Sequence, residues 1–294
     1  MKILIGIPVY NEEKKLPKLI KDLKKITAEI IVCNDGSTDN TEKVLENSGV
    51  HIINHKTNLG YGEAIKSIFN ESRLMKYDIL ITFDGDGQHR VEDIEKITKQ
   101  IENDEADIVI GSRFLDQNSK IPTYRKLGIK TITKLTNSSL TKSISDSQSG
   151  FRAYSKKVID GISLRESGMG ISTEILLKAS KKGYRISEVP IIINYEGDTS
   201  TYNPISHGTG VVISTIKFIS IEHPLKFYGI PGIVFLIFGI SFIFWALQIY
   251  GDTRVIFTNI TLIGVFGIIV GVILLITSVI LFTIIYLFKE KYNE

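Results

Sequence analysis

The segment Ile79-Leu80-Ile81-Thr82-Phe83-Asp84-Gly85-Asp86-Gly87-Gln88 joins a short apolar run directly to a polar cluster. Its first five residues predict a short buried strand, and two carboxylates and an amide follow at once. Alternate residues of an extended segment point the same way, so Asp84, Asp86 and Gln88 can converge on one ion. Hard divalent cations such as Mg²⁺ take oxygen ligands and share them with substrate phosphates. The stretch therefore indicates either a metal-bound nucleotide or a plain Asp-Gly hairpin turn.

Short apolar runs alternate with lysine-rich helical segments through the first half of the chain. The expected strands are 2–7, 29–33, 51–53, 78–83 and 107–110, and the expected helices are 12–25, 39–48, 60–74 and 92–103. This alternation predicts an α/β fold with a mainly parallel sheet covered on both faces. Ligands bind such sheets beyond the carboxyl ends of the strands.

Polar clusters follow the expected strands at that edge. They are Tyr10-Asn11-Glu12, Asn34-Asp35-Gly36-Ser37, the Asp84 cluster and Gly111-Ser112-Arg113. Ser37 to Asp39 can cap the next helix without help from Asp35. The Asp35 carboxylate is thus available to accept hydrogen bonds from a nucleobase.

The bulk composition excludes some classes of function. A net charge of +3 and the lack of an arginine-rich tract argue against nucleic acid as a partner. The single cysteine, Cys33, rules out an internal disulfide and fits a reducing compartment, and its apolar strand favours a core role. We expect no signal peptide, because Pro8 and a charged stretch follow the first apolar run directly. The catalytic part is therefore expected in the cytoplasm.

The C-terminal part of the chain is almost free of charge. Ile230–Tyr250 has 21 uncharged residues and Val255–Phe288 has 34, each enough to cross a hydrocarbon core of about 30 Å. The short link 251–254 predicts a hairpin with spans near 229–250 and 257–287. Lysines flank its outer ends, so the positive-inside tendency places both termini in the cytoplasm. The alternative, a buried core hairpin of a soluble protein, is disfavoured by the lengths.

Two further segments have an amphipathic pattern. Residues 205–221 carry one narrow apolar face, and Pro224 ends the segment just before the first span, so we interpret it as a helix in the membrane interface. Residues 124–141 fit an interfacial helix and an ordinary packed helix equally well.

With its motifs taken in order, the chain resembles the GT-A fold glycosyltransferases of family 2. The matching parts are Pro-Val-Tyr-Asn-Glu-Glu (8–13), Asn-Asp-Gly-Ser-Thr-Asp (34–39), Asn58-Leu59-Gly60-Tyr61-Gly62, Asp84-x-Asp86-x-Gln88 and Gly111-Ser112-Arg113. Asp-Ser-Gln-Ser-Gly-Phe-Arg (146–152) and the membrane hairpin narrow the resemblance to the dolichyl and polyprenyl phosphate sugar synthases. The resemblance implies a catalytic domain over 1–203, an interfacial helix over 204–225 and a transmembrane hairpin over 226–294.

The resemblance also implies roles for individual residues. Donor base and ribose would contact Pro8, Tyr10, Glu12 and Asp35, whereas Asp84, Asp86 and Gln88 would bind Mg²⁺ or Mn²⁺ with the diphosphate. Arg113 and Arg125 would meet the acceptor phosphate, and Asp146 matches a carboxylate near the reacting sugar. Two of these residues have plainer explanations, because Arg113 can pair with a carboxylate and Asp146 can cap a turn. The stretch 195–202 lacks the Arg or Lys that many relatives have, which leaves only His207 and Lys217 as nearby cations.

The implied activity is transfer of a hexose or N-acetylhexosamine from a UDP- or GDP-sugar to a polyprenyl (dolichyl) phosphate, with inversion, at the cytoplasmic membrane. Such an enzyme would feed protein or lipid glycosylation, and a homo-oligomer stays open. One alternative is a processive polysaccharide synthase, although the chain lacks the Gln-x-x-Arg-Trp motif of those relatives. Another is a non-catalytic membrane subunit that binds a sugar nucleotide.

Overall fold

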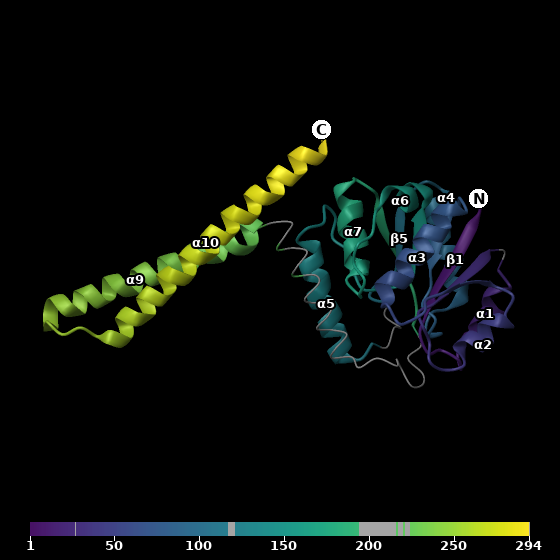
Figure 1. The fold of residues 1–294 in the computed structure, drawn as a ribbon, viewed down its shortest axis with the longest axis horizontal. Coiled ribbons are helices and arrows are strands. Elements are labelled where there is room, and N and C mark those ends of the chain that lie inside the picture. The colour runs from purple at the N-terminus through teal and green to yellow at the C-terminus, as the bar shows by residue number, and fades with distance from the viewer. Residues whose placement is uncertain (27, 117–120, 194–215, 217–219, 221–223, 294) are drawn as a thin grey trace. The chain divides into compact units, whose positions relative to one another are not determined.

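The computed structural model describes residues 1–293 except 27, 117–120, 194–215, 217–219 and 221–223 (Figure 1). The side chains of 124, 125, 286 and 288–293 also lie outside the description. The chain divides into two compact units, Met1–Thr215 and Ile216–Glu294. The expected boundary at 203/204 and most of the expected interfacial helix fall among residues that are not described, so both stay predictions.

The first unit is built on a seven-stranded sheet in the order β3-β2-β1-β4-β6-β5-β7. Six strands run parallel, which confirms the predicted mainly parallel sheet, and β6 is antiparallel to both of its neighbours. The strands are β1 (Ile3–Val9), β2 (Glu29–Asn34), β3 (His51–Asn54), β4 (Ile79–Thr82), β5 (Ile108–Ser112), β6 (Arg152–Ser155) and β7 (Ile186–Pro190).

Helices cover both faces of this sheet, as the alternation predicts. The helices on one face are α1 (Leu16–Leu23), α2 (Thr41–Glu46) and α4 (Ile94–Glu102), the last preceded by the short η1 (Val91–Asp93). Those on the other face are α3 (Tyr61–Leu74), α6 (Lys156–Gly161) and α7 (Ile171–Lys181). α1 begins four residues later than expected because Pro17 belongs in a first helical turn, where its missing N–H costs nothing.

Two strands were not expected from the sequence. β6 reads Arg-Ala-Tyr-Ser and β7 reads Ile-Ser-Glu-Val-Pro, and neither is the continuous apolar run that the other buried strands show. β6 matters most for function. Because it runs against β4 and β5, the residues just before it, 146–151, lie at the carboxyl ends of those strands.

α5 (Thr123–Asn137) answers part of the open question about 124–141. Its buried side chains are Ile132, Thr133 and Thr136, so its second half packs on the protein. Lys126, Leu127 and Lys130 are exposed on the first half. An ordinary packed helix accounts for the second half, and the interfacial role of the first half stays a prediction.

The elements described in the second unit are η2 (Leu225–Gly229), α9 (Ile230–Thr253) and α10 (Thr258–Asn293). Leu225–Thr253 and Thr258–Ile285 are long and apolar enough to cross a membrane. η2 is a π-helical turn placed just before Pro231, whose ring nitrogen has no hydrogen for the carbonyl four residues earlier. Glycines let α9 and α10 pack closely: a Cβ on Gly239 would lie 2.5 Å from the backbone nitrogen of Ile268.

Candidate active site

The predicted polar clusters meet at one edge of the sheet. The sheet contains four strands, β1, β2, β4 and β5, that run in the same direction. The residues that follow these strands therefore lie at the same edge of the sheet. β6 adds the preceding loop to that side, since Thr82 of β4 pairs with Arg152 and the Thr82 hydroxyl donates to the carbonyl of Gly150 (2.7 Å). The Asp84 cluster therefore faces residues 146–150 as well as the ends of the parallel strands.

Asp84 is held on three sides. His89 Nε2 lies 3.1 Å from Asp84 Oδ2, and the Tyr61 hydroxyl lies 3.4 Å from Oδ1. On the third side there is no room for a side chain at position 150, because a Cβ there would lie 2.4 Å from Oδ1 and 2.5 Å from Oδ2. Burial opposes ionisation of Asp84, but the hydrogen bond and charge of His89, with the charge of Arg113, hold its pKa below the usual value.

The pKa values of Asp86 and Glu12 are raised, whereas that of Asp84 is lowered. Burial, followed by the negative charge of Asp84, raises the pKa of Asp86. Burial also raises the pKa of Glu12 to about 7, with Lys15 opposing the shift and the charges of Asp86 and Asp39 adding to it. Three carboxylates from two loops are therefore close enough to repel one another, which favours a cation between or beside them.

The donor set fits a divalent metal with a diphosphate. Asp84, Asp86 and Gln88 present oxygen atoms, the ligand type that Mg²⁺ and Mn²⁺ prefer. The backbone N–H of Gln88 donates to Asp86 Oδ1 (3.0 Å), and Gly87 adopts a φ of +68° in this turn. Among the described residues no group of three or more His, Cys, Asp and Glu side chains surrounds one point. Substrate phosphate oxygens would therefore complete the coordination, as is usual for Mg²⁺.

Arg113 and Asp146 form a two-point ion pair. Arg113 Nε donates to Asp146 Oδ2 (2.6 Å), and Nη2 donates to Oδ1 (2.7 Å). The Asp146 side chain has no exposed surface, and that of Arg113 is 13% exposed. Burial opposes ionisation, but the charge and hydrogen bonds of Arg113 hold the pKa of Asp146 below its usual value. Glu188 of β7 supports the same turn by accepting hydrogen bonds from the backbone N–H groups of Ser145 (2.7 Å) and Asp146 (3.0 Å).

Asp35 is buried and already has three donors. Its carboxylate accepts the backbone N–H groups of Leu59 (3.0 Å) and Gly60 (2.8 Å) and lies 2.7 Å from His55 Nδ1. The residue thus ties the end of β2 to the loop before α3. A carboxylate can accept about four hydrogen bonds, so one position stays available and its predicted contact with a nucleobase stays a prediction.

Asn11 is a site residue whose role sequence reasoning missed. Its side-chain Oδ1 accepts the backbone N–H of Thr38 (2.8 Å), and its own N–H donates to the Ser37 hydroxyl (3.0 Å). It has a φ of +58°, a conformation that asparagine tolerates better than most residues. These bonds join the loop after β1 to the loop after β2. The Asn in Tyr10-Asn11-Glu12 was the available signal, because asparagine is enriched at such turns.

Arg152 is a second residue whose role was missed. It is 1% exposed, and its guanidinium donates to the backbone carbonyls of Ser149 (2.8 Å), Ser172 (2.8 Å) and Ser147 (2.7 Å). It therefore fixes the path of the chain between Asp146 and Gly150. An arginine among the strand residues of β6 was the signal for a buried, structural cation.

The remaining predicted residues are placed as follows. Pro8 is buried in β1 opposite Cys33, and Tyr10 is half-buried in the loop that follows. Arg125 belongs to α5, but its side chain lies outside the description, as do residues 195–202, His207 and Lys217. Their predicted roles stay predictions.

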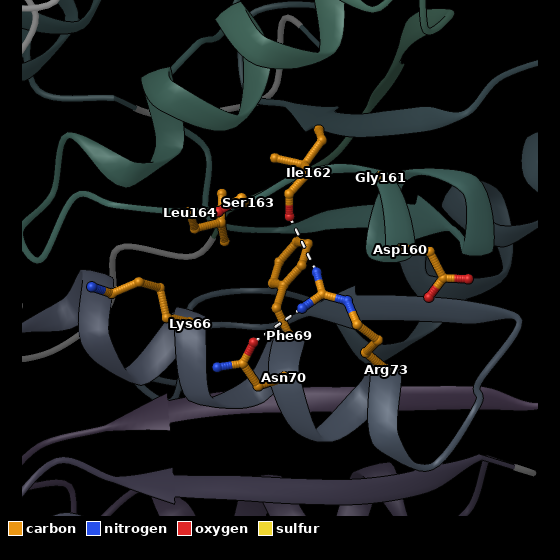
Figure 2. Close-up of a pocket in the computed structure, with 9 residues that line it drawn as sticks. All are labelled: Lys66, Phe69, Asn70, Arg73, Asp160, Gly161, Ile162, Ser163 and Leu164. Carbon is orange, nitrogen blue, oxygen red and sulfur yellow. Dashed lines mark hydrogen bonds between the residues drawn. The ribbon is translucent and has the colours of Figure 1, made fainter. Parts of the chain in front are cut away.

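A cavity of about 370 Å³ lies elsewhere in the first unit, between α3 and the chain that follows α6 (Figure 2). Its cations are engaged with the protein. Arg73 donates to the carbonyls of Ile159 and Ile162, and Lys66 lies 2.5 Å from Glu63. None of the predicted site residues lines this cavity, so we place the active site at the strand ends instead.

Comparisons with known proteins show the family to which the chain belongs. The family described as Glycosyl transferase family 2 matches residues 4–162. The chain is 33% identical over 233 residues to the UDP-N-acetylglucosamine--dolichyl-phosphate N-acetylglucosaminyltransferase of Methanococcus voltae. The aligned region covers 72% of this chain and 91% of that protein. It is 36% identical over 203 residues to the dolichol-phosphate mannosyltransferase of Pyrococcus furiosus, covering 65% of this chain and 56% of that protein.

A solved structure shows the same fold. Glucosyl-3-phosphoglycerate synthase from Mycobacterium tuberculosis, in complex with Mn²⁺, UDP and glucosyl-3-phosphoglycerate, matches with a TM-score of 0.58 at 17% identity, over 74% of this chain and 79% of that one. The expected GT-A fold is thereby confirmed. By its sequence match and its fold, this chain belongs to glycosyl transferase family 2.

Proposed function

We propose that this protein transfers a hexose or N-acetylhexosamine from a nucleotide diphosphate sugar to a membrane polyprenyl phosphate of the dolichyl type. The observation that carries the proposal is a continuous set of interacting charges at the strand ends. The charge of Asp86 raises the pKa of Glu12, and the charge of Asp84 raises the pKa of Asp86. The charge of Arg113 lowers the pKa of Asp84, and Arg113 pairs with Asp146. Carboxylates suited to a cation thus lie beside an arginine suited to an anion.

The donor side of the proposal rests on the loops after β1, β2 and β4. Pro8, Tyr10, Glu12 and Asp35 would contact the base and ribose of a UDP- or GDP-sugar. Asp84, Asp86 and Gln88 would hold Mg²⁺ or Mn²⁺, which supplies charge neutralisation for the departing diphosphate. The solved relative contains Mn²⁺ and UDP together, which supports a divalent metal in the family.

The acceptor side rests on the two arginines. A phosphate monoester is already largely ionised at pH 7, because its second pKa is about 6, so no strong general base is required. Arg113, oriented by Asp146, and Arg125 would reduce the repulsion between the two anionic substrates. An acceptor phosphate oxygen then forms the new bond to the anomeric carbon as the bond to the diphosphate oxygen breaks. In-line attack inverts the anomeric centre, and the nucleotide diphosphate leaves.

The second unit supports a lipid acceptor. The helices α9 and α10 would cross the cytoplasmic membrane with both termini and the catalytic unit in the cytoplasm. Anchoring enzyme and lipid in one bilayer lowers the entropic cost of their meeting. The named relatives from M. voltae and P. furiosus carry dolichyl or dolichol phosphate in their names, which also favours this acceptor.

The test is a donor panel with full-length protein purified in detergent. Radiolabelled UDP-GlcNAc, UDP-glucose and GDP-mannose are each incubated with Mn²⁺ and dolichyl phosphate, and lipids are extracted. We expect one donor to label the lipid fraction and Asp86→Ala to abolish that label. Labelled water-soluble polymer instead would revive the polysaccharide synthase. Donor binding without transfer to any lipid would support the non-catalytic subunit.

A further inference from the structure

His89 is a buried polar residue with an unusual environment. Its side chain is 4% exposed and lies five residues beyond Asp84. The ring centroids of Phe83 and Phe151 are 5.6 Å and 5.1 Å from that of the imidazole, and both phenylalanines are fully buried. The backbone of His89 is also fixed, because it forms an antiparallel bridge with Ile193. The imidazole is therefore held by apolar packing and by its own backbone.

One hydrogen bond gives this ring its polar contact. His89 Nε2 lies 3.1 Å from Asp84 Oδ2, and because an ionised carboxylate can only accept, the imidazole nitrogen donates. Nδ1 is buried and has no hydrogen-bond partner among the described residues. Placing an imidazole between two phenylalanines costs desolvation free energy, so a purely apolar residue would fill this position better if packing were its only role.

The contact fixes the direction of one particular carboxylate. Asp84 Oδ1 lies 3.4 Å from the Tyr61 hydroxyl, and a Cβ added to Gly150 would lie 2.4 Å from the same oxygen. Of the two hydrogen bonds to this carboxylate, the one from His89 is the shorter. Removing it frees the carboxylate to rotate about its side-chain torsions while the backbone of the turn stays in place.

We propose that His89 is a positioning residue that holds Asp84 in the orientation needed to bind the metal–diphosphate of the donor. The inference rests on the proposed function, because it assumes that Asp84 faces the metal. Hydrogen-bonded partners behind metal ligands commonly contribute 10- to 100-fold to metal affinity. His89 would act in this way although it touches neither donor nor acceptor.

The experiment measures Mn²⁺ affinity directly by electron paramagnetic resonance, with full-length protein in detergent and saturating UDP or GDP. His89→Phe keeps an aromatic ring and loses the hydrogen bond, and His89→Gln keeps an N–H donor of similar reach. Because phenylalanine can disturb the fold, His89→Asn, which is polar but too short, is measured beside it. His51→Phe is the matched control, since His51 is half-exposed in β3 and pairs only with Glu71 (3.5 Å) among the contacts described.

We expect His89→Phe and His89→Asn to weaken Mn²⁺ binding about tenfold or more, with His89→Gln and His51→Phe close to the unchanged protein. In turnover, the KM for the metal–donor should rise while the KM for lipid phosphate stays constant. Unchanged Mn²⁺ affinity in His89→Phe would overturn the inference, as would equal losses in His89→Phe and His89→Gln.

An Asp86→Asn arm separates this inference from the proposed function. If Asp86→Asn loses Mn²⁺ and His89→Phe does not, only the role of His89 is wrong. If neither change affects Mn²⁺ binding, the metal site itself is wrong and both proposals fall.

Discussion

Arg113 and Asp146, 33 residues apart in the chain, are joined by two parallel hydrogen bonds of 2.6 and 2.7 Å in a largely buried ion pair. The family resemblance suggested a separate role for each residue, with Arg113 on the acceptor phosphate and Asp146 near the reacting sugar, and pairing with a carboxylate was the plainer explanation of Arg113. The pairing links those roles, because Asp146 sets the plane of the guanidinium. Any phosphate bound by Arg113 meets a cation whose direction is already fixed.

Breaking this pair should reduce stability. Asp146→Asn removes the carboxylate charge that pairs with Arg113, and removal of one member of a buried ion pair costs about 3 kcal/mol of unfolding free energy. Urea unfolding of the full-length protein, followed by far-UV circular dichroism, measures the change. Asp22→Asn is the control, because Asp22 pairs with Lys25 at the surface and such pairs contribute little. Equal unfolding midpoints for all three proteins would show that the Arg113–Asp146 pair is not a structural element.

Gly150→Ala should inactivate the enzyme while leaving it folded. The new Cβ would lie 2.4 Å from Asp84 Oδ1, so the carboxylate must leave its position between His89 and Tyr61. Small displacements of a reacting group can cost about 100-fold in rate, and we expect a loss of that order in glycolipid formation. Gly168→Ala is the matched control, since a Cβ there meets no atom within 4 Å. Similar activity in both variants would remove the steric argument.

The stability of the metal-free protein should fall as the pH rises from about 5 to about 7. Burial, and then the charges of Asp86 and Asp39, raise the pKa of Glu12 from 4.5 to about 7 against the opposing effect of Lys15. Between these values the folded protein binds more protons than the unfolded chain, so raising the pH favours unfolding. Thermal unfolding in EDTA should show Tm falling across this window more steeply in the unchanged protein than in Glu12→Gln. Parallel Tm profiles would contradict the raised pKa.

The close packing of α9 against α10 should depend on the glycines at their contact. A Cβ on Gly239 would lie 2.5 Å from the nitrogen of Ile268 and 2.7 Å from the carbonyl of Gly264, so Gly239→Leu must push α9 and α10 apart. Small residues permit such close helix packing in membranes. Spin labels at Ile240 and Ile269, both exposed, should report a longer and broader distance by pulsed electron resonance. Gly251→Leu, at a position with open space around it, should leave the distance unchanged; the same distance in both variants would refute the packing.

Local sequence patterns predicted the parts of the fold that depend on neighbours in the chain. The apolar run before Asp84 predicted β4, and the polar clusters after β1, β2 and β5 predicted the edge where the site lies. β6 was missed because Arg152-Ala153-Tyr154-Ser155 has no strand-like apolar run, and its pairing with β4 and β5 is non-local.

Most of the contacts at the candidate site that the sequence did not predict depend on β6. Without β6, nothing places Gly150 against Asp84 or Asp146 against Arg113. The role of His89 was hidden for the same reason, because Phe151, which packs on its ring, precedes β6 by one residue. Contacts between distant segments depend on strand order, which the spacing of apolar residues does not encode.

Transfer of sugar to lipid should depend on a divalent metal. Full-length protein stripped with EDTA is given its nucleotide sugar and dolichyl phosphate, and glycolipid formation is followed as Mn²⁺ or Mg²⁺ is added. We predict that product rises from background to a plateau with the unchanged protein and stays at background with Asp86→Ala. Full glycolipid formation in EDTA, or equal rates for the two proteins, would contradict the assignment of Asp84, Asp86 and Gln88 as the site that binds the metal and the donor diphosphate.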